Sequence, residues 1–352
     1  MIKVAIVGVG NCASSLVQGV AFYSANSKAA GLIFRSIADR TLDQIEFVAA
    51  FDIDSDKVGK PLKEAIFQGR NNAQIFYDEN FSCAECEVSS APLLDSVGSG
   101  YIEELDGTSV SGDSDVDMVL ERTKPDILIN YLPVGADQAT QYWASKCLKY
   151  GVSFLNAVPS FICSDPNWAR KFEEAGIPCA GDDIKSQIGA TLIHRALCHA
   201  FDQRGGTIED TYQLNFGGNM DFLNMMEGNR LSSKKTSKTR SIQDEIKSSE
   251  STAIHISPSD HISYLGDKKI AYINLKGFAF GGAEIEIETK ISVQDSPNSA
   301  GCVVDIIRFL DLARSEGDIG VIDICGYYFK SPLISMNDDD GWNLARLKAT
   351  PS

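Results

Sequence analysis

The first residues constrain the fold most, because a short apolar run leads directly into a glycine-rich turn and then into a helical pattern. The run "IKVAIV" at residues 2–7 has the length and character of a buried parallel strand, and "GVGNCASS" at residues 8–15 follows it at once. Gly8 and Gly10 permit a tight turn and close approach of the backbone to a pyrophosphate, and Ala13 supplies the third small position, where helix meets strand. A strand, a glycine turn and a helix in this order predict a dinucleotide-binding fold.

Further apolar runs continue this beginning. Four more predicted strands lie at residues 46–52, 125–133, 151–159 and 176–183. Helical patterns at residues 136–150 and 165–175 separate the later strands. Strands that alternate with helices predict the α/β class, with a Rossmann-type doubly wound parallel sheet.

The pattern changes after Gly205. Residues 270–294 alternate in polarity like antiparallel strands that turn at Gly281 and Gly282, and residues 299–317 return to helical spacing. We therefore expect a dinucleotide-binding domain at residues 1–200, with a surface insertion at residues 70–118. A second, α+β catalytic and oligomerisation domain should follow at residues 201–294, and residues 295–352 should return to the first domain.

Composition excludes some classes of partner. The 352 residues include 32 Lys and Arg against 48 Asp and Glu, and the formal net charge of −16 argues against nonspecific binding to nucleic acid or to an anionic membrane. No apolar run approaches the roughly 18 residues of a membrane span, and the N-terminus does not resemble a signal peptide. Nine cysteines without a disulfide spacing favour the cytoplasm, and Cys83 with Cys86 lacks the two further ligands that a structural zinc needs.

Asp52 ends the second predicted strand, where an acidic side chain can bind both ribose hydroxyls of an adenosine. No Arg follows it to accept a 2′-phosphate, which favours NAD over NADP. Asp52 lies well beyond the usual distance of about 20 residues from the glycines, so this interpretation requires residues 25–44 to form a loop. The alternative is a surface Asp.

Two polar segments in the middle of the chain are candidates for a binding site. "GDDIKSQIGAT" at residues 181–191 leaves a strand and begins a helix, which places Asp183 and Lys185 at the carboxyl edge of the sheet, although an N-cap is the alternative for the acids. In "LNFGGNMDFLN", Asn215, Asn219 and Asp221 surround a glycine pair and suit a polyhydroxylated substrate. A capped turn is the alternative there.

The segment "RLSSKKTSKTR" at residues 230–240 concentrates five cationic side chains without an acid. Lys234 and Lys238 would share a face of a helix, and Ser233 adds a hydroxyl beside them. Two cations and a hydroxyl together can bind a phosphate monoester. A solvated basic loop is the alternative.

Three charged residues near the end of the chain are further candidates. Lys269 enters a strand, Asp295 begins a helix and Lys330 lies among aromatic and apolar neighbours, where a lysine can serve in proton transfer. A surface lysine is the alternative for either one taken singly. The four histidines have no metal or triad spacing, and we expect His194 and His199 to be structural.

Together these segments resemble the bacterial and archaeal myo-inositol-1-phosphate synthases over nearly the whole chain, apart from residues 70–118. The resemblance is carried by "VAIVGVGNCASSLVQG", "NYLPVG", "GDDIKSQIGAT", "NFGGNMDFLNM", "RLSSKKTSKT", "YLGDKKIA" and "QDSPNSAG". It implies that NAD⁺ oxidises carbon 5 of glucose 6-phosphate, that the carbon-6 enolate attacks carbon 1, and that NADH reduces the ketone to give 1L-myo-inositol 1-phosphate. The alternatives are an ordinary NAD-dependent dehydrogenase of a small phosphorylated or amino-acid substrate and a non-catalytic NAD-binding sensor.

The resemblance also implies site residues and an assembly. The implied catalytic residues are Lys234, Lys269, Lys330 and Asp221. The implied substrate ligands are Asn215, Asn219, Ser233, Lys238 and Asp295. The implied cofactor ligands are Gly8, Gly10, Asn11, Cys12, Ala13, Asp52, Asn130, Asp183 and Lys185. The family is typically a cytoplasmic homotetramer whose second domain supplies an interface, and its members use either a divalent or a monovalent cation.

Overall fold

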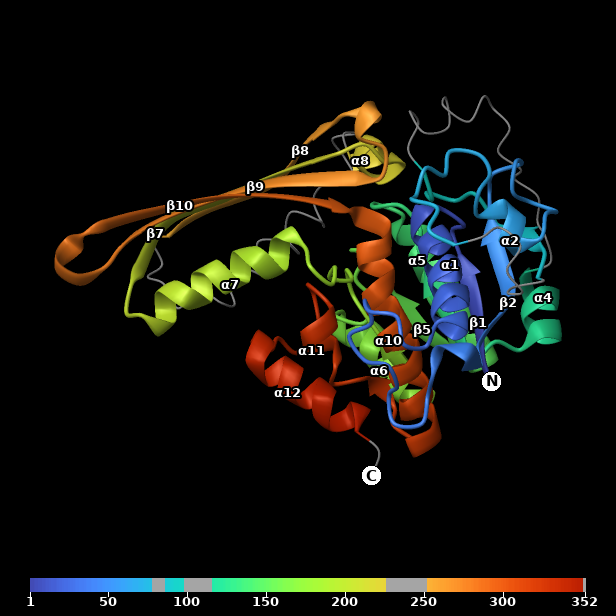
Figure 1. The fold of residues 1–352 in the computed structure, drawn as a ribbon. Coiled ribbons are helices and arrows are strands. Elements are labelled where there is room, and N and C mark those ends of the chain that lie inside the picture. The colour runs from blue at the N-terminus through green and yellow to red at the C-terminus, as the bar shows by residue number, and fades with distance from the viewer. Residues whose placement is uncertain (78–85, 98–115, 226–251, 351–352) are drawn as a thin grey trace.

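A seven-stranded parallel sheet forms the first domain of the protein (Figure 1). The computed structural model describes residues 1–77, 86–97, 116–225 and 252–350. The strands, in the spatial order β11-β6-β5-β4-β1-β2-β3, are Gly320–Val321, Pro178–Ala180, Ser153–Asn156, Ile127–Asn130, Ile2–Val7, Ile45–Asp52 and Val88–Ser90. All neighbours pair in parallel, which confirms the predicted doubly wound sheet.

Helices cover both faces of this sheet because successive strand residues point to opposite sides. Ile2, Val4 and Ile6 of β1 pack with α1 (Asn11–Ala25) and α10 (Asp295–Glu316). Ala5 and Val7 pack on the other side with α4 (Val116–Thr123), α5 (Asp137–Tyr150) and α6 (Pro166–Glu174). β1, which is apolar at every position except Lys3, is therefore buried on both faces, as its sequence predicts.

The loop between α1 and β2 explains the late position of Asp52. Residues 26–41 contain only turns, bends and one isolated bridge between Ile37 and Arg40, and a single 3₁₀ turn at Leu42–Gln44 precedes β2. The expected loop is therefore confirmed. The short helix α2 (Leu62–Ala65) follows β2.

A second, four-stranded sheet extends away from the first domain, and α7 (Ala190–Gln203) lies along one of its faces (Figure 1). Its strands, in the order β10-β9-β7-β8, are Glu284–Gln294, Lys268–Phe278, Thr207–Gly217 and Ala253–His261. β9 and β10 are antiparallel and turn at Phe280–Gly282, where Gly281 and Gly282 have φ of 72° and 79°. This confirms the predicted hairpin, and α8 (Met220–Met225) follows β7.

After β10 the chain returns to the first domain. α10 packs along α1, β11 joins the edge of the parallel sheet beside β6, and α11 (Cys325–Tyr328) and α12 (Asp338–Ala349) complete the fold. No helix within the described ranges is long and apolar enough to cross a bilayer.

Arg308 anchors α10 to the loop that precedes β2. Its guanidinium is fully buried and donates to the carbonyl oxygens of Phe34 (2.9 Å) and Arg35 (3.1 Å) and to the Asp305 carboxylate (2.5 Å), which also accepts from the Tyr328 hydroxyl. Arg308→Met should lower the free energy of unfolding by about 3–5 kcal/mol, because the fully buried Asp305 carboxyl would lose its partner. Urea denaturation measures the loss.

Arg314 on the same helix provides the control. Its guanidinium is partly exposed and lies 3.7 Å from Asp126, so Arg314→Met should cost less than about 1 kcal/mol. Equal losses for the two variants would contradict the role assigned to Arg308.

Candidate active site

A cavity of about 220 Å³ lies between the carboxyl ends of the parallel strands and the start of the second sheet. Ligands of doubly wound folds bind at this edge. The candidate residues that line the cavity are Gly10, Asn11, Cys12, Asp183, Lys185, Asn215, Asn219, Asp221, Lys269, Asp295 and Lys330. Residues far apart in the sequence are thus brought to one place by the return of the chain to its first domain.

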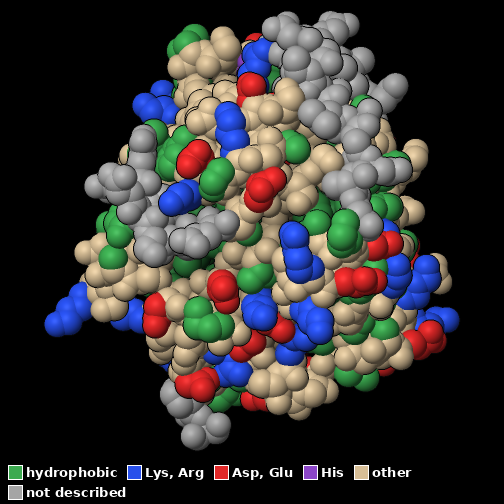
Figure 2. Space-filling view, turned by 90° about the vertical axis from the view of Figure 1, so that its right-hand side faces the viewer, with side chains coloured by type: hydrophobic (Ala, Val, Ile, Leu, Met, Phe, Trp, Pro, Cys, Tyr) green, Lys and Arg blue, Asp and Glu red, His purple; other side chains and the backbone are tan. Residues whose placement is uncertain are grey.

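The face shown in Figure 2 carries Lys and Arg side chains interspersed with Asp and Glu, outside the part that the grey atoms cover. On that visible part there is no broad field of one sign. Such a surface does not favour the polyanionic backbone of nucleic acid.

The glycine turn has the shape that a pyrophosphate requires. Gly8 has φ of +89°, and a Cβ there would lie 2.8 Å from the carbonyl oxygen of Tyr131, so no other residue fits. Gly10 directly precedes α1, and a Cβ at Gly10 would meet no heavy atom within 4 Å. The turn is therefore closed behind Gly8 and open at Gly10, which lines the cavity.

Four predicted cofactor ligands are not among the residues that line this cavity: Gly8, Ala13, Asp52 and Asn130. The Asp52 carboxylate accepts the backbone N–H groups of Val9 (2.6 Å), Ile53 (2.8 Å) and Asp54 (2.9 Å), so it fastens the glycine turn to the end of β2. The fully buried Asn130 amide donates to Thr140 and Asn156. In this structure both side chains hold the framework of the site.

The two neighbouring acids of the "GDD" segment have different tasks. The Asp182 carboxylate accepts five hydrogen bonds from Asn156, Ile162, Cys163 and Ser164, and although burial raises its pKa to about 6 it is ionised at neutral pH. Asp183 lies 2.7 Å from the Lys330 amine and lines the cavity with it. Asp182 therefore supports the strand end, and Asp183 holds Lys330 at the site.

Lys185 is buried, and its amine donates to the Gly326 carbonyl (3.3 Å) and to Asp338 (3.5 Å), which also pairs with Arg195 at 2.8 Å. Desolvation, and then the nearby Arg195 charge, lower its pKa from 10.5 to about 8. The charged amine therefore destabilises the folded state below pH 8. This penalty disappears as pH rises from about 8 to 10.5, because over that interval the unfolded chain binds more protons than the folded chain.

Lys185→Met removes this penalty. In the absence of cofactor, the midpoint of thermal unfolding of the wild-type protein should therefore rise relative to that of the variant between pH 8 and 10.5. Thermal denaturation of both proteins across that range measures the difference. A difference independent of pH would contradict the lowered pKa.

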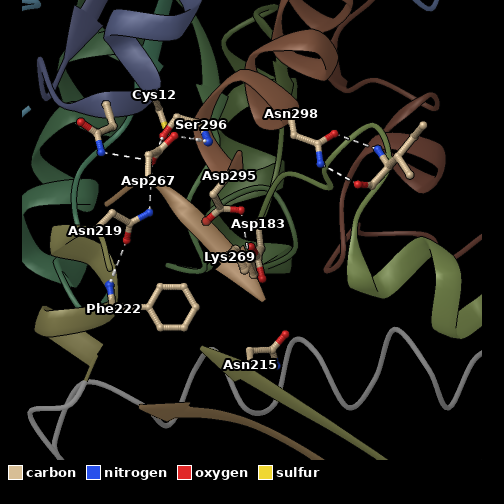
Figure 3. A network of polar contacts seen from close by, with 12 residues as sticks. Cys12, Asp183, Asn215, Asn219, Phe222, Asp267, Lys269, Asp295, Ser296 and Asn298 are labelled. Carbon is tan, nitrogen blue, oxygen red and sulfur yellow. Dashed lines mark hydrogen bonds and ion pairs between the residues drawn. The ribbon is translucent and has the colours of Figure 1, made fainter. Parts of the chain in front are cut away.

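Asp267, which sequence reasoning missed, is the centre of a polar network (Figure 3). Its buried carboxylate accepts from the Asn11 amide (3.1 Å), the Asn219 amide (3.4 Å) and both the hydroxyl (2.7 Å) and the backbone N–H (3.0 Å) of Ser296. Desolvation, the largest effect, raises the pKa of this carboxyl. Asp267 thus joins the glycine turn, the segment before α8 and the start of α10.

Lys269, two residues further along, reaches the cavity beside this network. Its amine lies 3.2 Å from the Asp295 carboxylate at the first residue of α10 and 5.7 Å from the Phe222 ring centroid. Cys12 lies at the same place, 3.9 Å from the Ser296 hydroxyl, and burial raises its thiol pKa to about 12. The thiol is therefore protonated and is not a nucleophile.

Residues 70–72 differ from the expected surface insertion. Arg70 and Asn71 line the cavity, the Asn71 amide donates to the Val9 carbonyl (3.0 Å), and the Asn72 backbone N–H donates to the Asn11 side chain (2.8 Å). Nothing in the local sequence signals this return to the glycine turn.

Some candidates lie outside the described residues, namely Ser233, Lys234, Lys238 and Cys83. Within the described ranges, no group of three or more His, Cys, Asp and Glu side chains could hold a metal ion.

Comparison with known proteins identifies the family. A sequence profile described as myo-inositol-1-phosphate synthase matches residues 189–296. Inositol-3-phosphate synthase of Mycolicibacterium smegmatis is 45% identical over 96% of this chain and 95% of its own length. The enzyme of that name from Corynebacterium glutamicum is 44% identical over 96% and 95%.

The fold agrees with these matches. The crystal structure of a myo-inositol-1-phosphate synthase-related protein from Thermotoga maritima covers 100% of both chains, with a TM-score of 0.83 and 23% identity. The alignments with the two bacterial relatives each span 96% of this chain. The chain therefore belongs to the myo-inositol-1-phosphate synthase family.

Proposed function

We propose that this protein is an inositol-3-phosphate synthase that converts D-glucose 6-phosphate into 1L-myo-inositol 1-phosphate in the cytoplasm. The observation that carries the proposal is that Lys269 and Lys330 line one cavity with the open end of a glycine turn, each held by a carboxylate. Two relatives with that activity in their names are 44% and 45% identical over nearly their full length. The eight described cysteines are free thiols, which suits a reducing compartment.

The residues of the turn fit NAD. Gly10 leaves room for a phosphate where any side chain would project, and α1, a helix of 15 residues, begins at Asn11 with its backbone donors directed to the same place. Gly10, Asn11 and Cys12 would hold the pyrophosphate, and Asp183 with Lys185 would lie towards the nicotinamide. When bound, NAD supplies the temporary oxidation of carbon 5.

The polar residues of the second half would hold the open-chain sugar. Asn215, Asn219 and Asp221 can each fix a hydroxyl group in one direction, and all three line the cavity. Ser233, Lys234 and Lys238 are proposed to bind the phosphate and to assist proton removal at the carbon-5 hydroxyl.

Two lysines are proposed to act on the oxygens that become negative. During enolisation and ring closure charge develops on the ketone and aldehyde oxygens, and a preorganised N–H donor stabilises such charge most. Asp183 positions Lys330 at 2.7 Å and Asp295 positions Lys269 at 3.2 Å, so neither amine must reorganise when the charge forms.

The proposal includes a homotetramer. One face of the second sheet is covered by α7, whereas Tyr212 and Tyr272 on the other face are 38% and 43% exposed in the single chain. Such a face suits burial against another copy, and light scattering after size exclusion measures the mass.

The product assay tests the activity. The protein is incubated with glucose 6-phosphate and a small fraction of one equivalent of NAD⁺, and both phosphate species are followed by phosphorus NMR. We expect complete conversion to inositol phosphate without net NADH. Stoichiometric NADH with no cyclic product would instead establish a dehydrogenase, and no conversion would favour a sensor. Parallel assays with EDTA, with K⁺ and with NH₄⁺ identify whether a divalent or a monovalent cation is needed.

A further inference from the structure

His194 on α7 is fully buried between that helix and the second sheet. Its Nε2 lies 2.6 Å from the Thr211 hydroxyl and its Nδ1 lies 3.3 Å from Oε1 of Gln213, both on β7. Gln213 in turn donates from Nε2 to Oδ1 of Asn215 at 2.8 Å. One continuous chain of polar contacts therefore leads from His194 to two residues of the cavity wall, Gln213 and Asn215.

The direction of this chain is fixed at its end. The Asn215 amide nitrogen lies 2.9 Å from the carbonyl oxygen of Ser257, which can only accept a hydrogen bond. Oδ1 of Asn215 must therefore face Gln213, and Gln213 must present its own NH₂ group to it. The Gln213 oxygen consequently faces His194.

This direction determines the tautomer of His194. Burial lowers the pKa of the imidazole to about 4, so the ring is neutral and carries one proton at pH 7. The Gln213 oxygen can only accept, so the proton lies on Nδ1 and Nε2 must accept. The one proton of the Thr211 hydroxyl, which also lies 2.7 Å from the Asn274 carbonyl oxygen, then points to Nε2.

Beyond these contacts Asn215 keeps one N–H and one oxygen lone pair. An amide can rotate by 180° about its last bond with little change of shape, which would exchange a donor for an acceptor at the cavity wall. The contacts with Ser257 and Gln213 prevent that exchange.

We propose that His194 and Gln213 are positioning residues for catalysis, because the Nδ1–H of His194 holds the Gln213 amide and, together with the Ser257 carbonyl, fixes which edge of Asn215 meets a hydroxyl of the substrate. The proposal rests on the proposed function, in which Asn215 binds the sugar. Sequence reasoning assigned His194 a structural role, because a single histidine on a helix gives no sign of what faces it across a sheet.

Two substitutions of the same histidine separate positioning from packing. In His194→Asn the amide nitrogen replaces Nδ1 and still donates to Gln213. In His194→Gln the amide reaches only the place of Nε2, so Gln213 loses its donor. We expect roughly a ten-fold higher KM for glucose 6-phosphate in His194→Gln, the effect of one lost hydrogen bond, and less than about a three-fold change in His194→Asn.

Three measurements accompany the kinetics. Affinity for NAD should be unchanged in both His194 variants, since His194 does not contact the glycine turn. His199→Gln makes the same substitution on the same helix, where the imidazole lies 3.5 Å from Asp339 near solvent, and should leave KM unchanged. Gln213→Met interrupts the same chain at its middle. Because Gln213 also lines the cavity, its KM should rise at least as much as that of His194→Gln.

A double-mutant cycle completes the test. In the Asn215→Ala background, His194→Gln should have no further effect on KM, because nothing remains to be positioned. Additive effects, or equal KM values for His194→Asn and His194→Gln, would overturn the proposal. Absence of turnover by the wild-type protein would instead refute the proposed function.

Discussion

Lys330→Met should lower kcat at least 100-fold, on the order of the loss from one preorganised donor to a developing oxyanion, while NAD still binds. The amine lies in the cavity 2.7 Å from Asp183, and the backbone N–H of Lys330 donates to the Asp183 carbonyl at 2.8 Å. The backbone contact survives the substitution, so the chain keeps its path and only the cation is lost. Single-turnover kinetics of cyclisation and NAD titration measure the two effects separately.

Lys348→Met is the matched control for this variant. Lys348 lies on α12, away from the cavity, and pairs with Asp323 at 3.1 Å near solvent, so its loss should leave kcat unchanged. Full turnover by Lys330→Met would contradict the catalytic role of Lys330.

Gly10→Val should reduce affinity for NAD at least 100-fold, and turnover with it, without unfolding the protein. Gly10 has φ of −91°, which any residue tolerates, and the added side chain would meet no protein atom near Cβ. The valine would therefore project into the space that a pyrophosphate needs. Isothermal titration with NAD and the midpoint of thermal unfolding measure affinity and stability.

Gly8→Ala provides the contrast. Its positive φ and the Tyr131 carbonyl at 2.8 Å mean that the new methyl group strains the turn itself, so stability as well as affinity should fall. If Gly10→Val bound NAD normally, the cofactor would not approach this turn and its placement would be wrong.

The candidate residues whose place at the cavity could be predicted from the sequence are those that local chemistry specifies. Gly10 reaches the cavity because strand, turn and helix follow each other within fifteen residues, and Asp183 because a strand end always faces the carboxyl edge of a sheet. The hairpin at Gly281 could likewise be predicted, since alternating polar and apolar residues and a glycine pair define it.

What the sequence could not predict depends on contacts between distant segments. Asn11 and Asp267 are 256 positions apart, and only the packing of the second sheet against the first brings them to 3.1 Å. Asp182 and Asp183 are adjacent and chemically identical, yet their different surroundings make one a support and the other a partner of Lys330. Residues 70–72 carry no motif, so their contact with the glycine turn could not be predicted from the sequence.

The position of Asp267 has a consequence for the order of events during turnover. In the proposed function the Asp267 carboxylate would link the coenzyme side of the cavity, through Asn11, to the sugar side, through Asn219 and Ser296. Opening the cavity between these two sides would have to break all of these hydrogen bonds. We therefore expect the coenzyme to stay bound while one substrate molecule is oxidised and then reduced again.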